Sequence, residues 1–374
     1  MLVQRILQRN IEKVLFKNKV ILVYGARQVG KTTVLRELQK KYPTGAVYFN
    51  CDEPDVRASF TNTTSTALRA FVKDKKLVLL DEAQRVPDIG LTLKLMVDNF
   101  PEIQVIATGS SSFDLSNKIV EPLTGRKYEF YLFPFSVEEL APTRSPVESR
   151  RLLEQMMIYG LYPEVEQKSG EAEGLVKNLA RSYPYKDVLQ YQDIRNPELL
   201  EKLLQAVALQ IGSEVSYTEL GRLVGANRVT VMSYLNILEK AFIIFRLRPF
   251  SRNPRKELSK MHKVYFYDTG IRNALINNFN PLSLRADAGA LWENFWISER
   301  LKNNSNHERD VNKFFWRTYS QQEVDYVEEV GGKIEGFECK WSETKKTKAP
   351  SEWADLYGTE SYKVITPEVF FDEV

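Results

Sequence analysis

The segment Gly25–Thr32 limits what this 374-residue chain can fold into more than any other part of its sequence. It reads GARQVGKT, in which Gly, Gly, Lys and Thr fill the fixed positions of the spacing GxxxxGK[ST]. The apolar run KVILVYG (19–25) leads into it, and TTVLRELQKKY (32–42), which has helical spacing, follows it. Glycines let the backbone wrap around an anion, and exposed N–H groups at a helix N-terminus favour negative charge. The sequence therefore predicts a phosphate-binding loop between a buried strand and a helix.

Three more apolar runs follow within the first 140 residues, and helical segments separate them. They are AVYFNC (46–51), KLVLLDE (76–82) and IQVIATGSS (103–111). Short apolar runs that alternate with helices are typical of a parallel sheet buried on both faces. We therefore expect an α/β domain over residues 1–140, with an amphipathic helix over residues 1–17 leading into it.

The predicted loop gives its residues distinct roles toward a nucleotide. Lys31 would place a positive charge between the β- and γ-phosphates, and the Thr32 hydroxyl would bind Mg²⁺. The residues expected to contact the nucleotide are Gly25, Ala26, Arg27, Gln28, Val29, Gly30, Lys31, Thr32 and Thr33.

Two acids, Asp81 and Glu82, come at the end of the third apolar run. Asp81 is expected to hold the same Mg²⁺, and Glu82 is expected to polarise the water that attacks the γ-phosphate. Small-molecule kinases with such a loop need no water-activating Glu directly after the Asp, so the pair favours hydrolysis over transfer. The alternative is a solvated strand end, which the complete loop makes the weaker interpretation.

Further catalytic candidates lie between residues 103 and 131. The run VIATGSS ends in polar residues, of which Thr108 and Ser110 are candidates for sensing the γ-phosphate, and Ser110 is assigned to nucleotide contact. Arg126, in LTGRKYEFYLFP, is the candidate for a catalytic cation that stabilises charge in the transition state, in cis or across a subunit interface. A plain polar strand end and a surface arginine are the alternatives.

The expected nucleotide is ATP. Guanine selectivity normally needs an NKxD-type loop, and Asn117-Lys118-Ile119-Val120 has the Asn and Lys but lacks the Asp. ATP and Mg²⁺ are therefore the expected ligands of the first domain.

Residues 147–250 have a mainly helical pattern with few strand-like runs. Within them, SYTELGRLVGANRVTVMSYLNILEKAFII (216–244) has helix–turn–helix spacing, and AFIIFRLRPF can supply a wing strand. The outward face of the second helix has no Lys or Arg beyond Arg228, which is poor for phosphate contacts. Packing or partner contact and DNA binding therefore both stand as roles of this winged-helix-like region.

A local excess of positive charge follows the helix–turn–helix pattern. The segment 246–263 carries seven Lys or Arg and one acid, Glu257. Such an excess either follows a nucleic-acid backbone, with strong salt dependence, or forms a solvated loop. Double-stranded DNA is therefore a candidate partner, although the net charge of the whole chain, 52 − 49 or +3, excludes a histone-like polycation.

Residues 262–374 form the third predicted region, which mixes strand-like runs with one long helix. Glu293 lies on that helix, whereas Asp325 lies in the strand EVDYV and Glu338 in the next strand, FECKW. A period of two puts Glu338 and Lys340 on one face, and pairing of the two strands as a hairpin brings Asp325 beside them.

These acids predict a second metal site. Asp325 and Glu338 would hold Mg²⁺, Glu293 could add a ligand, and Lys340 would orient or deprotonate water for phosphodiester attack. The alternative to an active nuclease is a nuclease-like fold kept as a binding module.

Few residues support any other chemistry. Two Cys and two His are too few for a disulfide framework or a His-rich metal centre. No apolar run reaches the roughly 18–20 residues of a membrane span, and the N-terminal residues lack the core of a signal peptide. We therefore expect a cytoplasmic protein with no membrane partner.

Several motifs together resemble the AAA family of prokaryotic ATP-binding proteins with a C-terminal DUF4143 domain. They are GARQVGKTT, LVLLDEAQRV, VIATGSSSFDL, LTGRKYEFYLFPFSVEEL, KVYFYDTGI, ALWENF and EVDYV with FECKW. The first motifs occur in many P-loop ATPases, and their combination with the last three makes the resemblance specific. It covers nearly the whole chain and implies an AAA-type ATPase fold, a middle winged-helix-like region and an α+β C-terminal fold of the PD-(D/E)xK nuclease type.

The sequence thus favours an ATP-binding, ATP-hydrolysing protein with nucleotide-gated DNA binding. Two alternatives accompany this interpretation. One is an Mg²⁺-dependent DNA nuclease, and the other is a non-hydrolysing ATP switch that acts on a protein partner.

Overall fold

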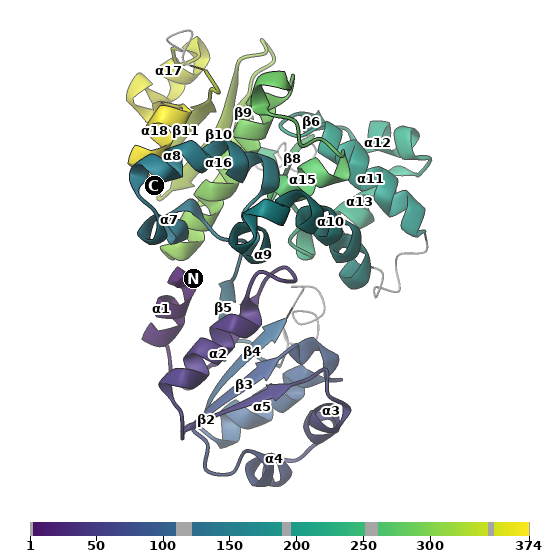
Figure 1. Ribbon diagram of the computed structural model, residues 1–374, viewed down its shortest axis with the longest axis vertical. Coiled ribbons are helices and arrows are strands. Elements are labelled where there is room, and N and C mark those ends of the chain that lie inside the picture. The colour runs from purple at the N-terminus through teal and green to yellow at the C-terminus, as the bar shows by residue number, and fades with distance from the viewer. Residues whose placement is uncertain (1–2, 110–121, 189–195, 251–260, 343–347, 374) are drawn as a thin grey trace. The chain divides into compact units, whose positions relative to one another are not determined.

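The structure, a computed structural model, describes residues 3–109, 122–188, 196–250, 261–342 and 348–373 (Figure 1). The chain forms two compact units. The first contains residues 1–135 with 240–242, and the second contains residues 136–239 with 243–374. None of the described helices is long and apolar enough to cross a membrane.

The first unit is built on a five-stranded sheet with the order β2-β3-β4-β1-β5, and every neighbouring pair is parallel. Its strands are β1 (Val20–Tyr24), β2 (Ala46–Asn50), β3 (Leu77–Asp81), β4 (Gln104–Gly109) and β5 (Lys127–Tyr131). All residues of β1, β3 and β4 are buried, as expected of a sheet covered on both faces. The expected α/β fold is therefore confirmed, with β4 inserted between β1 and β3.

One helix precedes these strands, and the others connect them and cover the sheet (Figure 1). They are α1 (Ile6–Lys13), α2 (Lys31–Lys41), α3 (Pro54–Phe60), α4 (Ser65–Val72) and α5 (Ile89–Asn99). Parallel strands need such crossover connections, and their carboxyl ends all meet at one edge of the sheet. The loops after β1 and β3 and the last residues of β4 therefore meet at that edge.

The second unit begins with helices and contains the helix–turn–helix segment. Its first helices are α7 (Val137–Leu140), α8 (Pro146–Tyr159), α9 (Pro163–Gln167), α10 (Ala172–Val188), α11 (Pro197–Leu209), α12 (Tyr217–Val224) and α13 (Arg228–Lys240). Gly225 ends α12 in the left-handed conformation at φ 74°. The side chain of Asn227 then accepts a hydrogen bond from the N–H of Thr230 at 2.9 Å. The Gly and Asn of the predicted turn therefore end one helix and begin the next.

A seven-stranded mixed sheet, in the order β12-β11-β10-β9-β7-β8-β6, forms the rest of this unit. Its strands are β6 (Glu214–Val215), β7 (Ile244–Pro249), β8 (His262–Phe266), β9 (Asn312–Arg317), β10 (Glu323–Val330), β11 (Lys333–Cys339) and β12 (Tyr362–Ile365). The accompanying helices are α15 (Thr269–Leu275), α16 (Ala288–Asn306), α17 (Ser351–Tyr357) and α18 (Pro367–Glu373). Because β7 pairs with β9 in parallel, strands of the middle region and of the C-terminal region share one sheet.

Aromatic side chains fill much of the core beside this sheet. Trp353 of α17 is fully buried and packs against Trp316 at a centroid distance of 5.4 Å. Burial of each such side chain contributes roughly 1.5–3 kcal/mol to folding. This core packs against β9 and β10, and the strands β10 and β11 carry Asp325 and Glu338.

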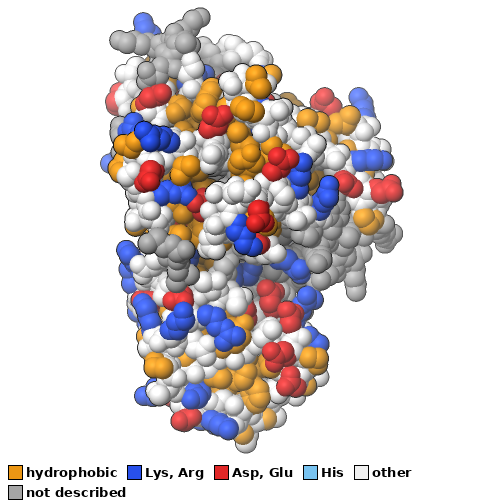
Figure 2. Space-filling view, viewed as in Figure 1, with side chains coloured by type: hydrophobic (Ala, Val, Ile, Leu, Met, Phe, Trp, Pro, Cys, Tyr) orange, Lys and Arg blue, Asp and Glu red, His pale blue; other side chains and the backbone are white. Residues whose placement is uncertain are grey.

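The surface has a mixed charge. On the face shown in Figure 2, Lys and Arg side chains are interspersed with Asp and Glu side chains over the described residues. This mixture agrees with the small net charge of +3. Binding of an anionic ligand on this face would therefore depend on local groups.

Candidate functional site

The loop after β1 has a backbone that only certain residues allow. A Cβ on Gly25 would lie 2.1 Å from the carbonyl oxygen of Leu132, so no larger residue fits there without a shift. Gly30 has φ 101° and begins α2, and Gln28 also has a positive φ of 60°. A Cβ on Gly30 would meet no protein atom within 4 Å. The loop is therefore tight on the side of β5 and open above Gly30, where a phosphate would approach.

Lys31 supplies the positive charge of this loop. Its side chain is buried, and Nζ donates to the carbonyl oxygens of Gly25 and Ala26, each at 2.8 Å. The ammonium thus lies inside the curve of the loop, at the first residue of a helix. A buried cation, a helix N-terminus and open space above Gly30 together fit the phosphates of a nucleotide.

Asp81, the last residue of β3, accepts three hydrogen bonds from hydroxyl groups. Oδ2 accepts from Thr32 Oγ1 at 2.6 Å and from Tyr48 OH at 2.7 Å, and Oδ1 accepts from Thr108 Oγ1 at 2.5 Å. Asp81 is 3% exposed. Thr32 and Asp81 are 49 residues apart in the sequence, and their contact creates the pair of oxygens expected to hold Mg²⁺.

Glu82 adopts a left-handed backbone at φ 54°, which is uncommon for a residue with a side chain. Its N–H donates to Thr108 Oγ1 at 3.1 Å, and its carboxylate accepts from Gln84 Nε2 at 2.5 Å. Both contacts hold the turn that separates the Glu82 carboxylate from the one on Asp81. The two carboxylates therefore have different hydrogen-bond partners, as two separate roles would require.

Tyr48 and Arg36 lie near Asp81 and were not singled out from the sequence. Tyr48 of β2 contacts Asp81, and the guanidinium of Arg36 lies 3.4 Å from the centroid of its ring. Burial, followed by the hydrogen bond to Asp81, raises the pKa of Tyr48 well above its usual range. A tyrosine in an otherwise apolar strand beside the Asp strand was the available signal.

Of the two candidates for sensing the γ-phosphate, the structure describes one, Thr108. Thr108 contacts both Asp81 and the N–H of Glu82, so it links the inserted strand to the acids. Ser110 lies outside the described residues. Thr108 is thus the polar residue of β4 that the structure brings to the site.

Arg126 does not lie at this edge of the sheet. Its carbonyl accepts from the N–H of Val20, the first residue of β1, so it lies at the amino end of the parallel strands. The five residues of β1, about 16 Å of extended chain, separate it from the loop. Its guanidinium pairs with Asp98 at 2.7 Å and is 43% exposed. The structure therefore does not bring Arg126 to the phosphate loop of its own chain.

The C-terminal acids Asp325 and Glu338 lie side by side on the hairpin of β10 and β11. The register pairs Tyr326 with Phe337, so Asp325 and Glu338 are opposite each other at the next position. The N–H of Cys339 donates to Asp325 Oδ2 at 2.9 Å, and Lys340 Nζ donates to Glu338 Oε1 at 2.5 Å. The predicted juxtaposition of Asp325, Glu338 and Lys340 is therefore present.

A lysine that the sequence did not single out lies among these acids. Lys263 of β8 is 2% exposed, and its Nζ lies 3.2 Å from Glu293 Oε1 and 3.6 Å from Asp325 Oδ1. It also forms an ion pair with Glu323. Tyr265, two residues further on the same strand, donates to Glu293 Oε1 at 2.6 Å. The alternation in KVYFY was the available signal, because it puts Lys263 and Tyr265 on one face.

Burial changes the protonation of these acids. Burial and then repulsion from Asp325 raise the pKa of Glu293 to about 8 and the pKa of Glu338 to about 7. Burial also raises the pKa of Asp325. Burial by itself would lower the pKa of Lys263, but attraction to Glu293, Asp325 and Glu323 outweighs it, so Lys263 stays charged.

One observation favours a metal ion in this acidic cluster, and another opposes it. Glu338 Oε2 is buried and has no hydrogen-bond partner among the described residues, as an unused metal ligand would be. Lys263, however, already places a cation between Glu293 and Asp325. Over the part of the chain that the structure describes, no three His, Cys, Asp or Glu side chains are grouped as metal ligands.

Three families of protein domains match successive parts of this chain. The family described as an AAA domain matches residues 17–141. A domain of unknown function, DUF8612, matches residues 150–282, and another, DUF4143, matches residues 288–369.

Similar proteins span most of the chain at low identity. An uncharacterised protein of Mycobacterium tuberculosis is 27% identical over 339 residues, which are 89% of this chain and 73% of the relative. An uncharacterised protein of Methanocaldococcus jannaschii is 24% identical over 346 residues, which are 86% of this chain and 75% of the relative.

Among solved structures, the Thermotoga maritima RuvB Holliday junction branch migration motor aligns with 68% of this chain and 91% of its own length. The identity is 16% and the TM-score is 0.33. A point variant of Thermotoga maritima RuvB aligns with 75% of this chain and 96% of its own, at 14% identity and a TM-score of 0.34. These TM-scores are too low for an inference about fold or function.

Proposed function

Since residues 17–141 are an AAA domain and residues 288–369 are a DUF4143 domain, we propose that this protein binds ATP with Mg²⁺ and hydrolyses the ATP. The observation that carries the proposal is the hydrogen bond of 2.6 Å between Thr32 and Asp81. It joins the end of the phosphate loop to the acid at the end of β3, which is the arrangement that a nucleotide-bound Mg²⁺ requires.

Each residue near this bond has a role in the proposed reaction. The N–H groups of residues 25–33 and the Lys31 ammonium bind the phosphates, and Thr32 and Asp81 hold Mg²⁺. The metal ion, when bound, neutralises charge on the phosphate oxygens. Glu82 orients the attacking water and accepts its proton, and Thr108 keeps Glu82 and Asp81 at a constant separation.

Arg126 can take part only from a second copy of the chain. It lies at the amino edge of the sheet, and its side chain is exposed although it pairs with Asp98, so a neighbouring subunit can reach it. We therefore assign it a role in trans, as a cation that stabilises transition-state charge at the neighbour's site.

The test of hydrolysis is phosphate release from ATP by wild type and by Glu82→Gln, each with and without duplex DNA. The variant should still bind ATP and lose turnover by about a hundredfold or more, because general-base catalysis contributes that much. Glu37→Gln is the matched control and should keep its turnover, because Glu37 is a partly exposed acid on α2 that pairs with Lys40. An unchanged rate in Glu82→Gln would remove the assigned role, and no release by any form would leave ATP as a switch that acts on a protein partner.

Nucleotide-gated DNA binding is the proposed use of this ATPase. Turnover that rises with duplex DNA, or DNA affinity that changes with ATP, would support it. If DNA does not change ATP turnover and ATP does not change DNA affinity, a protein client is favoured instead. The expected cytoplasmic location stays a prediction.

A second candidate function is Mg²⁺-dependent cleavage of DNA by the C-terminal region. The specific observation that favours it is Glu338, whose Oε2 is buried without a partner in the described residues, beside Asp325 and Lys340. Lys340→Ala should abolish nicking of supercoiled DNA and leave ATP hydrolysis unchanged, whereas Lys333→Ala on the same strand should affect neither. Nicking that persists in Lys340→Ala would exclude this site as its source.

A further inference from the structure

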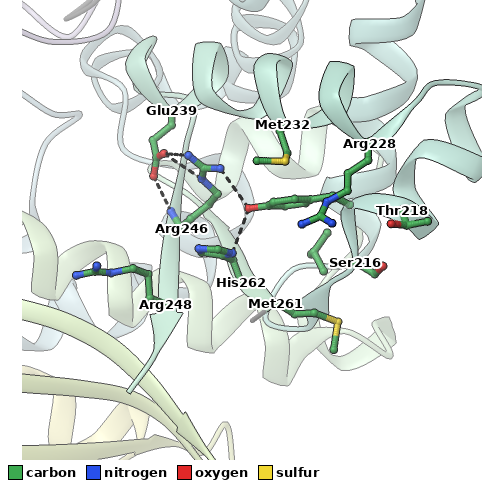
Figure 3. A pocket seen from close by; sticks show the side chains of 11 residues that line it. Ser216, Thr218, Arg228, Met232, Glu239, Arg246, Arg248, Met261 and His262 are labelled. Atoms are coloured by element: carbon green, nitrogen blue, oxygen red, sulfur yellow. Dashed lines mark hydrogen bonds and ion pairs between the residues drawn. The ribbon is translucent and has the colours of Figure 1, made fainter. Parts of the chain in front are cut away.

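A polar pocket of about 580 Å³ lies in the second unit, between α12, α13 and the strands β7 and β8 (Figure 3). This volume lies within the range of ligand-binding pockets. Its walls carry three arginines and one histidine, and the acid among its lining residues is Glu239. The residues that line it are Val215, Ser216, Tyr217, Thr218, Arg228, Met232, Glu239, Arg246, Arg248, Met261 and His262.

Arg246 is a structural member of the pocket wall. Its guanidinium donates to Glu239 Oε2 through Nε at 3.0 Å and through Nη2 at 2.5 Å, and Nη1 donates to the Tyr217 hydroxyl at 3.2 Å. Nη2 also donates to Asn236 Oδ1 at 2.6 Å. The charge of Arg246 is therefore balanced by Glu239, and each of its three side-chain nitrogens donates a hydrogen bond.

Glu239 does not balance the charges of the other two arginines, Arg228 and Arg248. Neither has a carboxylate partner among the described residues, and the guanidinium of Arg248 lies 5.4 Å from the ring centroid of Phe314. Figure 3 shows the two arginines on opposite sides of Arg246 and His262. The pocket thus has an excess of two positive charges, separated by its centre.

The centre of the pocket offers neutral hydrogen-bonding groups. The rings of Tyr217 and His262 are stacked, with centroids 5.8 Å apart and planes 12° apart, and the Tyr217 hydroxyl lies 3.2 Å from His262 Nδ1. Ser216 and Thr218 add hydroxyl groups to the wall. Burial, and then the charge of Arg246, lower the pKa of His262. An anion bound nearby would act in the opposite direction and raise it.

We propose that this pocket binds phosphate esters, with Arg228 and Arg248 as the residues that contact them. Arginine recognises phosphate through its planar set of donors, and hydroxyl groups complete such sites. Duplex DNA is the source that the geometry favours, because a ligand with repeated phosphates can meet two cations on opposite sides of one pocket. A free nucleotide is the other source of the same chemistry. The choice of DNA rests on the DNA-binding part of the proposed function, whereas the pocket's affinity for phosphate does not.

The first arm of the test is the affinity of the full-length protein for a fluorescein-labelled duplex of about 20 base pairs, measured by anisotropy across a salt series. Arg228→Gln and Arg248→Gln should each weaken binding by about tenfold at low salt and reduce the slope of log K against log salt by about 1. Arg222→Gln is the matched control, because Arg222 is an exposed arginine of α12 that does not line the pocket. It should bind as wild type does.

The second arm detects a small ligand at the pocket itself. The chain has two histidines, so the ring resonances of His262 and His307 can be followed by NMR. Thymidine 5′-monophosphate, added to a Lys31→Ala chain so that the phosphate loop does not compete, should raise the pKa of His262 and leave His307 unchanged. The shift should disappear when Arg228 and Arg248 are both changed to Gln.

The outcomes distinguish DNA from a free nucleotide as the ligand, and they distinguish failure of this proposal from failure of the proposed function. Loss of DNA affinity in the pocket variants and not in Arg222→Gln supports the proposal with DNA as the ligand. A second outcome is DNA binding that is unchanged in the variants, or absent, while the pKa shift of His262 depends on the two arginines. This outcome supports the proposal with a nucleotide as the ligand and contradicts DNA binding through this region. If neither DNA affinity nor the His262 shift depends on the two arginines, the proposal is wrong. ATP turnover in the absence of DNA, which none of the pocket variants should alter, is measured separately with Glu82→Gln.

Discussion

The Nζ atom of Lys263 lies 3.2 Å from a carboxylate oxygen of Glu293, and the lysine side chain is 2% exposed. An ammonium so deeply buried is stable only while its acids surround it, because an uncompensated charge in a low-dielectric interior is costly. The same lysine also neutralises Glu323 and Asp325. Glu293, Glu323 and Asp325 are therefore grouped around one buried cation.

Replacing this cation should strongly destabilise the protein. Lys263→Met keeps the length of the side chain but removes the buried cation that contacts three acids. Urea denaturation at pH 8 should therefore show a loss of about 3–5 kcal/mol. Lys333→Met, an exposed lysine of β11, is the control and should be close to wild type. A loss in Lys263→Met no larger than that of the control would mean that the network does not need its cation.

Glu293 should make the stability of the protein depend on pH. Its pKa is raised to about 8 in the folded protein from an ordinary value near 4.5, so between these values the folded state binds more protons than the unfolded state. The contribution of Glu293 is therefore most favourable at acid pH and declines as the pH rises toward about 8. Glu293→Gln, which does not titrate, should lose less stability than wild type between pH 5.5 and 9, as measured by urea denaturation at a series of pH values. Parallel pH profiles would contradict this prediction.

Thr108 should be needed for turnover beyond its effect on stability. Thr108→Val keeps the shape but removes the hydroxyl that donates to Asp81 and accepts from the N–H of Glu82, which should cost about 1–3 kcal/mol. ATP turnover should fall by about tenfold or more while ATP binding is retained, because Glu82 loses its position. Thr92→Val is the control, since Thr92 is also buried and its hydroxyl donates to the carbonyl of Phe60, away from the acids. Equal turnover in the two variants would argue against a role for Thr108 in the reaction.

Arg126 should act only between copies of the chain. Arg126→Ala and Lys31→Ala should each be inactive alone, the first because it lacks the cation and the second because it lacks the phosphate-binding lysine. Mixing the two purified variants should restore part of the ATP turnover, since a site with Lys31 can then face a neighbour with Arg126. Activity of Arg126→Ala alone that equals wild type would show that this arginine has no catalytic role. An inactive mixture of variants that still associate would contradict the assignment in trans.

The amino-acid sequence by itself determined the parts of this protein that depend on neighbours in the chain. The spacing of Gly25, Gly30, Lys31 and Thr32 predicts the loop because each residue acts through the backbone conformation of a short segment. Alternation along β10 and β11 predicts that Asp325, Glu338 and Lys340 meet, because a hairpin gives a nearly fixed register. Apolar runs alternating with helices likewise predict the parallel sheet of the first unit.

Only the tertiary structure decided which distant residues complete these sites. Tyr48 and Thr108 reach Asp81 because β2 and β4 flank β3, and strand order is not encoded in any one segment. Arg126 follows the nucleotide motifs in the sequence, yet it lies at the opposite edge of the sheet because β5 begins where the parallel strands begin. Lys263 enters the acidic cluster from a strand far before Asp325 in the sequence. Local spacing specifies backbone conformation, whereas burial, charge compensation and strand order arise from contacts that exist only after the chain has folded.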